Sequence, residues 1–262
     1  MTDPAAVVAE LTAGTGFAVL PHAVPAELLV EARDRLTQIM ARQRAAGRTL
    51  REENRERVYG LLHEDPVFWR LLERSPVFEI ARLFLANEAV CISGFSAHIL
   101  EPGHDTVGIH VDYPYFLMRD PLPAFPPLGI QAIWALDDFR VDNGAPYFVP
   151  GSQKLRRKPE HVPGADKCVP IVADAGALVI SHALCWHDCT ANRSQGARIA
   201  LLANVTPVYI RPIENPTFGV SADALVGDAE MRRVLGLEFY DTAPTRENGR
   251  QEPRRMNDVV VH

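Results

Sequence analysis

The chain has 262 residues, of which 47% are apolar and 23% charged, as in ordinary globular proteins with a sizeable core. Its net charge of -6 argues against binding to nucleic acid or to an anionic membrane surface. No apolar run approaches the roughly 18 residues that a membrane-spanning helix needs. The first residues, "MTDPAAVVAELTAG", lack the basic and apolar segments of a secretory signal. Four cysteines are too few for a disulfide framework in a chain this long, so we expect free thiols and a cytoplasmic protein.

The first part of the chain, about residues 1–88, has the pattern of helices. Between residues 25 and 47, apolar side chains recur at the three-to-four spacing of one buried stripe: Leu28, Ala32, Leu36, Ile39 and Met40. Two shorter helices are expected between residues 65 and 87, each opened by a proline that follows Asp65 or Ser75. We expect these helices to brace one side of the fold.

From about residue 89 the pattern changes to short strands separated by Gly, Pro and Asn. The strand candidates are residues 89–100, 128–138, 145–152, 167–173, 176–187 and 198–210. Helices followed by many short strands predict a mainly β fold with bracing helices, whose core is a double-stranded β-helix (a cupin-like jelly roll) with the N-terminal helices packed on one sheet. With no internal repeat or linker, we expect one domain over 1–262: a helical part at 1–88, a jelly-roll core at 89–212, and a C-terminal helix (about 223–236) and tail within 213–262.

Residues 113–127, "YPYFLMRDPLPAFPP", form a long connection that contains five prolines. Loops of this length without secondary structure are often lids or binding loops, although an irregular crossover over the core is the alternative. Under the lid interpretation, Tyr113, Tyr115 and Phe116 line a substrate pocket.

His110 and Asp112 lie two residues apart, just before this connection. On an extended chain, residues at i and i+2 point to the same face, so an imidazole and a carboxylate would converge on one ion. His-x-Asp also occurs by chance, and a metal site therefore requires a third ligand.

His187 and His182 are the main candidates for that ligand, because both follow Gly176 in a strand-like stretch. A hairpin reversal centred on Asn192 and Arg193 would place His187 opposite Arg198. His182 has no such partner, and we expect it to be a satisfied core histidine. The cluster "CWHDC" at 185–189 also suggests structural zinc, but no second pair of ligands follows, and buried free thiols are favoured.

Two histidines and one carboxylate occupy one face of an octahedral ion and leave three positions open, which suits Fe(II). Two open positions would take the 2-oxo acid end of 2-oxoglutarate and the third would take O2. Arg198 would hold the far carboxylate of 2-oxoglutarate, since a planar guanidinium binds a carboxylate bidentately.

The order of motifs resembles the phytanoyl-CoA dioxygenase family of Fe(II)/2-oxoglutarate-dependent oxygenases over about residues 14–211. The resemblance is carried by "GFAVLPHAVPAELLVEARDRL", "HVD", "WALDDFRVDNGAPYFVPGSQK" and "GALVISHALCWHDCTANRSQGARIALL". It implies that the iron ligands are His110, Asp112 and His187, that Arg198 anchors 2-oxoglutarate, and that Trp134 lies near this cosubstrate.

Departures from the family pattern include Gln153 in place of the histidine of "PGSH", and Pro146 in place of a more usual aliphatic residue. Both lie in a turn or strand away from the expected ligands, so they bear on details of the substrate rather than on iron. The halogenating relatives lack the carboxylate supplied here by Asp112, so its presence favours hydroxylation or a related oxidation.

Two further residues are candidates for the cavity. His98 would lie beside the cosubstrate, or else be a packed core histidine. Arg57 belongs to a basic stretch that also contains Arg42, Arg44, Arg48, Arg51 and Arg55. Such a stretch is usually a solvated face, and the alternative is a clamp for a small substrate that bears a carboxylate or a thioester.

These features predict a non-haem Fe(II)/2-oxoglutarate-dependent dioxygenase that hydroxylates an unactivated C–H bond of a small organic substrate, with release of succinate and CO2, and a biosynthetic pathway is the setting we expect. Two alternatives remain: a zinc-dependent hydrolase with the same ligands, and a non-catalytic barrel that binds a small ligand. The sequence leaves the substrate and the oligomeric state open.

Overall fold

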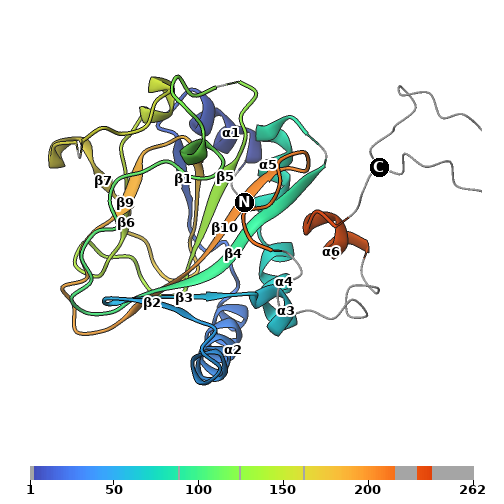
Figure 1. Ribbon diagram of the computed structural model, residues 1–262, viewed down its shortest axis with the longest axis vertical. Helices are drawn as coiled ribbons and strands as arrows, with labels where there is room; N and C mark the ends of the chain where they lie inside the picture. Colours follow the sequence, from blue (N-terminus) through green and yellow to red (C-terminus); the bar gives the residue numbers. More distant parts are fainter. Residues whose placement is uncertain (1–2, 88, 124, 162, 216–228, 238–262) are drawn as a thin grey trace, which may run out of the picture.

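The computed structural model describes residues 3–87, 89–123, 125–161, 163–215 and 229–237. In this part of the chain the strands form two antiparallel sheets (Figure 1). The larger has the order β1 (Phe17–Leu20), β8 (Leu178–His182), β5 (Ile130–Ala135), β10 (Arg198–Pro207), β4 (Val90–Leu100), β3 (Arg55–Tyr59) and β2 (Leu50–Glu52). The smaller has the order β7 (Val169–Pro170), β6 (Pro146–Phe148) and β9 (His187–Cys189). This arrangement confirms the predicted jelly-roll core.

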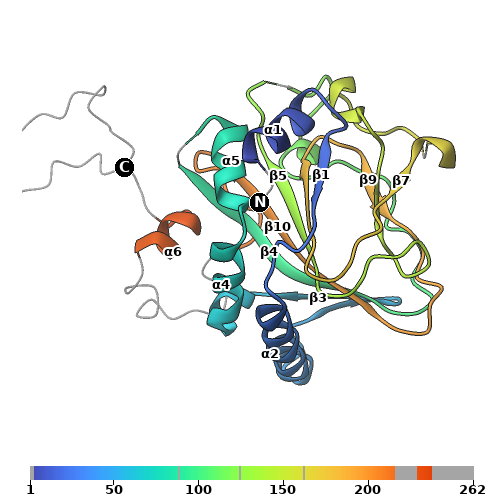
Figure 2. The ribbon, with the colours of Figure 1, turned by 180° about the vertical axis from the view of Figure 1, so that it is seen from behind.

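Helices cover the side of the large sheet that faces away from the small sheet (Figures 1 and 2). They are α1 (Pro4–Thr12), α2 (Ala26–Ala45), α3 (Leu61–Glu64), α4 (Pro66–Arg74), α5 (Val77–Leu85) and α6 (Ala229–Val234). Short 3-10 helices lie at η1 (Tyr115–Leu117), η2 (Ser152–Leu155) and η3 (Ala165–Lys167). None of the described helices is long and apolar enough to cross a membrane.

The large sheet separates an apolar core from a more polar face, because successive side chains of a strand point to opposite sides. On β5, Ile130, Ala132 and Trp134 pack into the core shared with the helices, whereas Gln131 and Ile133 face the small sheet. The predicted stripe of α2 is buried in the same core. Each fully buried Leu or Ile of such a core contributes about 1.5–3 kcal/mol.

The N-terminal part is less helical than the sequence predicts. It contains three strands, β1, β2 and β3, that join the large sheet. Leu20 pairs with Leu178, and Arg57 pairs with His98. These strands were missed because they are short and their pairing partners lie far along the chain, so no local periodicity reports them.

The stretch 176–187, predicted as one strand, is two strands in different sheets. β8 ends at His182, and a turn then carries the chain to β9 in the small sheet. The predicted hairpin between His187 and Arg198 is therefore wrong. His187 pairs with Phe148 and forms a bridge with His110, whereas Arg198 pairs with Leu100 in the other sheet. In a jelly roll, consecutive strands cross between sheets, which a hairpin rule based on sequence spacing does not anticipate.

The described part of the C-terminal segment contains α6, whose Val234 and neighbouring Leu235 are buried in the core that the helices share with the large sheet. The other predicted portions, helix residues 223–228 and the tail beyond 237, lie outside the described residues.

Candidate active site

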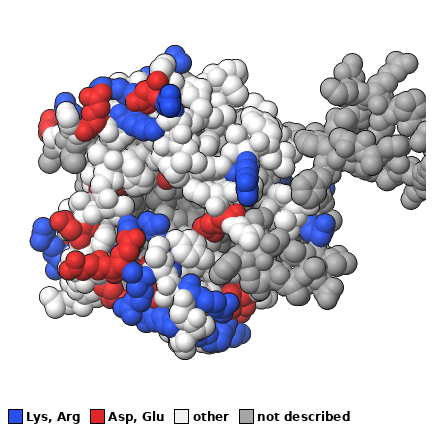
Figure 3. Space-filling view, viewed as in Figure 1, with Lys and Arg blue, Asp and Glu red and all other residues white. Residues whose placement is uncertain are grey.

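A cavity of about 510 Å³ lies between the two sheets. Its walls include strands β3, β4, β5 and β10 of the large sheet and β9 of the small sheet. In Figure 3 the surface is hollowed near the middle of the face shown, with both acidic and basic side chains around the hollow. All three predicted metal ligands and the predicted anchor, Arg198, line this cavity.

His110, Asp112 and His187 converge in the cavity. Each offers one ligand atom, and these atoms lie within 4.8 Å of one another. The Nε2 atom of His187 is 3.5 Å from Oδ2 of Asp112, and the two imidazole rings have centroids 4.4 Å apart. In the sequence, His187 lies 75 positions after Asp112 and 77 after His110. A backbone bridge between His110 and His187, which extends the small sheet, brings the three residues together.

The backbone fixes the orientation of both imidazoles in the same way. Nδ1 of His110 is 2.7 Å from the carbonyl oxygen of Gly108, and Nδ1 of His187 is 2.9 Å from that of Cys185. A carbonyl oxygen only accepts hydrogen bonds, so each Nδ1 carries the proton and donates it. Each Nε2 therefore has a free lone pair, the form in which histidine binds a metal.

Burial shapes the charge of this cluster. It lowers the pKa of His187, and together with the neighbouring His187 it lowers the pKa of His110. Burial also raises the pKa of Asp112 to about 6. Oδ2 of Asp112 and Nε2 of His187 are buried without a hydrogen-bond partner among the described residues. Buried acceptors that face one another without a donor are unfavourable alone, and a bound cation would satisfy both. The donor set therefore fits a divalent metal.

Arg198 begins β10 and is buried beneath the cavity. Its Nη2 donates to the carbonyl oxygen of Gly144, and its guanidinium lies 5.2 Å from the ring centroid of Phe139. Its Nε is buried without a hydrogen-bond partner in the described structure. Burial lowers the pKa of Arg198 to about 10, so the group keeps its charge at neutral pH. A buried guanidinium with an unused donor is suited to bind an anion.

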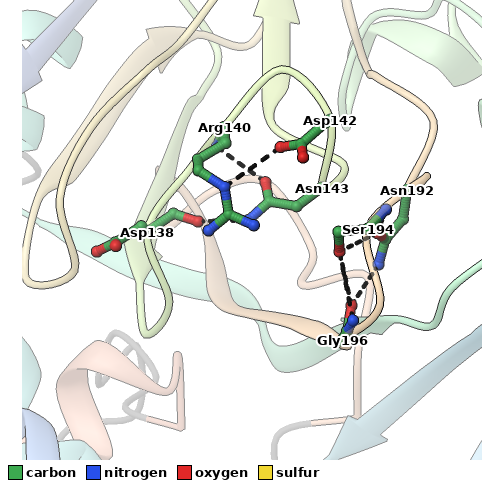
Figure 4. A network of polar contacts seen from close by, with 7 residues as sticks. All are labelled: Asp138, Arg140, Asp142, Asn143, Asn192, Ser194 and Gly196. Atoms are coloured by element: carbon green, nitrogen blue, oxygen red, sulfur yellow. Dashed lines mark hydrogen bonds and ion pairs between the residues drawn. The ribbon is translucent and has the colours of Figure 1, made fainter.

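Two asparagine-centred turns face each other (Figure 4), one just before Gly144 and the other just before β10, which begins at Arg198. Asn192 donates from Nδ2 to the carbonyl oxygens of Leu100 and Gly196, and its Oδ1 accepts from the backbone N–H of Ser194. In the facing turn, Asn143 donates to Asp138 and accepts from the N–H of Arg140. The two asparagines form a backbone bridge. This network positions both Gly144 and the start of β10.

Four of the other candidate residues also line the cavity: His98, Arg57, Tyr113 and Phe116. Nε2 of His98 lies 3.2 Å from Oγ of Ser96, and the side chain faces the cavity, as one of its two interpretations predicts. The arginines of the basic stretch fall into two groups. Arg42 and Arg48 form ion pairs with Glu64, and Arg44 with Glu56, as expected for a solvated face. Arg55 and Arg57 face the cavity from β3.

Trp134 and Tyr115 are not where the sequence predicts. Trp134 is fully buried on the helix side of β5, with its ring 6.1 Å from that of Phe95. The alternation along β5 turns it away from the cavity, and the cavity side belongs to its neighbours Gln131 and Ile133. Tyr115 belongs to the connection 113–127, but its side chain is buried, and its hydroxyl accepts a hydrogen bond from the N–H of Leu128. It supports that connection instead of lining the pocket.

The remaining histidine and cysteine predictions agree with the structure. His182 is buried against Phe84 and Tyr115 and accepts from the N–H of Leu184, as a core histidine does. Cys185 and Cys189 are free and buried, and neither joins His187 in a group of potential metal ligands within the described residues.

Sequence reasoning missed several polar cavity residues, among them Gln131, Asn204 and Glu214. A signal exists for two of them, because Gln131 lies in an otherwise apolar strand and Asn204 interrupts the apolar run of residues 199–205. A polar side chain in such a strand is expected to face a site instead of the core. For Glu214, which follows β10 outside any strand, no local pattern provides a signal.

Comparison with known proteins gives matches to oxygenases. Residues 13–200 match the family described as phytanoyl-CoA dioxygenase (PhyH). Dioxygenase af480 of Aspergillus fumigatus is 30% identical over 159 residues, which cover 59% of this chain and 50% of that protein. The chain thus spans about half the length of this fungal relative. An uncharacterized protein of Mycobacterium tuberculosis, Rv1501, is 28% identical over 246 residues, covering 88% of this chain and 85% of its own.

The fold also matches solved structures. The epimerase SnoN, crystallised in complex with Fe3+, alpha ketoglutarate and nogalamycin RO, superposes with a TM-score of 0.62, covering 98% of each chain at 19% sequence identity. At this identity the likeness shows a shared fold. The family match is the stronger finding, because it covers well over half of the chain and contains all three clustered ligands and Arg198. This chain belongs to the phytanoyl-CoA dioxygenase family.

Proposed function

We propose that the protein is an Fe(II)/2-oxoglutarate-dependent dioxygenase that hydroxylates a small organic substrate. The observation that carries the proposal is the cluster of His110, Asp112 and His187, whose ligand atoms lie within 4.8 Å of one another beside the buried Arg198. Membership of a dioxygenase family supports it, as does the fold shared with SnoN, an epimerase crystallised in complex with Fe3+ and alpha ketoglutarate.

In this proposal the two Nε2 atoms and the Asp112 carboxylate hold the iron. Both imidazoles are already in the required tautomer, since each donates from Nδ1 to a carbonyl oxygen two residues earlier in the chain. When bound, iron supplies the activation of O2 by oxidative decarboxylation of 2-oxoglutarate, which gives succinate, CO2 and a hydroxylated product. The balance is one O2 and one 2-oxoglutarate for each C–H bond converted to C–OH.

The chain's other residues would bind and orient the reactants. Arg198 would pair with the far carboxylate of 2-oxoglutarate, held in place by the Gly144 carbonyl that accepts one of its N–H groups. His98 lies two register positions from the pair of Arg198 and Leu100, and its side chain faces the same cavity. Burial, followed by the charges of Arg57 and Arg198, lowers the pKa of His98 well below its usual range. His98 is therefore neutral and able to donate or accept one hydrogen bond to the cosubstrate.

Arg57, Tyr113 and Phe116 would contact the substrate. Arg57 Nε is buried without a hydrogen-bond partner among the described residues, which supports a role in holding an anionic group. Tyr113 and Phe116, 6.0 Å apart by ring centroid, are at the start of the connection 113–127 and suit it to be a lid. A place in a biosynthetic pathway is supported by the fold shared with SnoN, which is an epimerase from nogalamycin biosynthesis.

The test is anaerobic loading of the purified protein with Fe(II), followed by addition of 2-oxoglutarate and then O2. We expect one equivalent of bound iron and succinate formation that requires both iron and O2. If the protein instead binds zinc in place of iron, hydrolyses ester or amide probes and forms no succinate, the zinc hydrolase is favoured. If it binds no metal and forms no succinate, the ligand-binding barrel is favoured.

A further inference from the structure

A second group of polar residues lines the cavity away from Arg198 and has no role in the function proposed above. On the cavity face of the large sheet, Gln131 of β5 pairs with Asn204 of β10, which pairs with Gly94 of β4. This row crosses three adjacent strands at one level. It lies four residues along β4 from His98, or roughly 13 Å at about 3.3 Å per residue. The cavity therefore has two separate polar ends on the same sheet.

The carboxylate of Glu214 lies beside this row, in the space that a side chain at position 94 would otherwise occupy. The segment after β10 docks onto β4 where the strand register shifts: the N–H groups of Ile213 and Glu214 donate to Ser93, and the N–H of Phe95 donates to Oε2 of Glu214. A Cβ atom on Gly94 would lie only 2.8 Å from Oε1 of Glu214. A residue with a side chain at 94 would displace this carboxylate, so the glycine and the docked segment together place it in the cavity.

The row presents acceptors that nothing in the described structure satisfies. Oε1 of Gln131 and Oδ1 of Asn204 are buried without a hydrogen-bond partner, and Gln131 as a whole is only 7% exposed. Among the described residues Glu214 forms no ion pair, and its Oε1 accepts no hydrogen bond, although Arg57 lines the same cavity. The net pKa of Glu214 is raised, because burial outweighs the hydrogen bond from the Phe95 N–H and the charge of Arg57, which both act to lower it. Buried acceptors without donors are unfavourable unless a ligand supplies the donors.

We propose that Glu214, Gln131 and Asn204 form the substrate-recognition site and bind a protonated amine of the substrate. An ammonium group has three donors and no acceptor, which matches one carboxylate oxygen and two amide oxygens. A hydroxyl group supplies one donor and no charge, and would leave the Glu214 carboxylate without an ion-pair partner, with only the charge of Arg57 acting on it from beyond ion-pair distance. This assignment rests on the proposed function, because it supposes that the cavity receives a substrate.

The body of that substrate is apolar. Between the two polar ends the cavity is lined by Ile133, Leu202 and Ser96, whose hydroxyl is already paired with His98. Near the edge of the cavity lie Phe116 and Ile213, which are 41% and 49% exposed. The Tyr113 hydroxyl donates to the carbonyl oxygen of Arg211, so the connection 113–127 is tied to the segment that carries Glu214. The geometry thus selects an amine on a hydrophobic skeleton, held between the lid and the large sheet.

The test uses three matched series of probes on four apolar bodies: cyclohexyl, adamantyl, 2-phenylethyl and decyl. Each body bears an ammonium, a hydroxyl or a carboxylate group, and dissociation constants at neutral pH are measured by ligand-observed NMR on the full chain. The variants are Glu214→Gln, which keeps an acceptor for the Phe95 N–H, and Glu27→Gln, an exposed control on α2. Binding of Fe(II) and 2-oxoglutarate to the same proteins is followed anaerobically, so failure of the proposed function is detected separately.

In the wild type, at least one amine should bind about tenfold more tightly than its alcohol, the difference expected from one charge-assisted hydrogen bond. Glu214→Gln should abolish this preference while iron and 2-oxoglutarate binding stay unchanged, and Glu27→Gln should retain it. The absence of any preference for amines in the wild type, or its survival in Glu214→Gln, would overturn the proposal. If Glu214→Gln does not fold, Gln131→Leu takes its place; it removes one of the three acceptors and should reduce the amine preference, and an unchanged preference would overturn the proposal.

Discussion

The two walls of the cavity are built in different ways. On the small-sheet side, each histidine of the cluster is oriented by the carbonyl oxygen two residues before it, at Gly108 for His110 and at Cys185 for His187. On the large-sheet side, Arg198, His98 and Asn204 owe their positions to the register between β10, β4 and β5. The orientation of each histidine on one wall is thus set by a short stretch of sequence, whereas the positions of the residues on the other wall are set by the pairing of distant strands.

This difference has a functional meaning. A metal site needs fixed ligand directions, and local hydrogen bonds from Nδ1 supply them whatever substrate is bound. Recognition of the organic reactants needs groups spaced along the cavity, and strand register supplies that spacing in steps of two residues on one face. Changes on the first wall should therefore remove metal binding outright, and changes on the second should alter which ligand binds and how tightly.

The largest effect is expected on the metal wall. His187→Ala should lower the affinity for Fe(II) by more than about 100-fold, since even outer-shell partners of metal ligands are worth about 10–100-fold. The fold should persist, because the core on the helix side does not include this residue. Anaerobic equilibrium dialysis measures the affinity, and His161→Ala at an exposed position is the control. Unchanged iron binding in His187→Ala would contradict the assignment of His187 as a metal ligand.

The next effect tests the large-sheet wall at Arg198. Arg198→Ala should weaken 2-oxoglutarate binding by roughly 30- to several-thousand-fold, because removing one member of a buried charge pair costs about 2–5 kcal/mol. Iron affinity should change little. Arg198→Lys should recover only part, since an ammonium lacks the planar fork.

Titration of 2-oxoglutarate into anaerobic ferrous protein, followed by the metal-to-ligand absorption band, gives these dissociation constants. Arg193→Ala, an exposed arginine in the same connection, is the matched control and should bind as the wild type does. Equal constants for Arg198→Ala and the wild type would remove the anchor and leave a metal site without an assigned cosubstrate.

A smaller effect is expected where the two strand ends are held together. Asn192→Ala removes the hydrogen bonds to the carbonyl oxygens of Leu100 and Gly196, of which the second still accepts from Ser194 Oγ. The free energy of unfolding should fall by about 1–3 kcal/mol, since each of the two lost hydrogen bonds contributes about 0.5–1.5 kcal/mol. Ser194→Ala, which leaves both bonds in place, should lower it by less than about 1 kcal/mol. Urea unfolding measures both, and an equal midpoint for Asn192→Ala and the wild type would argue against this network as a support for Arg198.

The smallest effect concerns the edge of the large sheet. Burial acts to raise the pKa of Glu56, but hydrogen bonds and charge from Arg44 outweigh it, so the net pKa is lowered. A lowered pKa in the folded state adds stability above the unfolded-state value of about 4.3, and this stability is lost as the pH falls through the folded-state pKa. Glu56→Gln should therefore reduce stability at pH 7 and flatten its decline below about pH 4. Urea unfolding at several pH values, with Glu27→Gln as control, measures this; parallel pH profiles of variant and wild type would contradict it.

Several features were predictable from the sequence because their causes are local. The α2 stripe repeats at helical spacing, and its five apolar residues are buried as expected. His110 and Asp112 face one site because of their i, i+2 spacing, and the cluster with His187 agrees with the ligand set chosen from the sequence. The strand that contains Arg198 was also predicted, although its assumed pairing with His187 was wrong. That the chain forms a single domain stays a prediction.

What only the tertiary structure decided depends on contacts between distant residues. Strands β1 and β3 are too short to show a period, and they exist because β8 and β4 offer them partners. Trp134 faces the helices because pairing with β10 and β8 sets which side of β5 is the cavity side. Glu214 enters the cavity through a register shift at Gly94. Side-chain chemistry can be identified from the sequence, but the face that a strand presents is decided by its neighbours, since a shift of one residue reverses it.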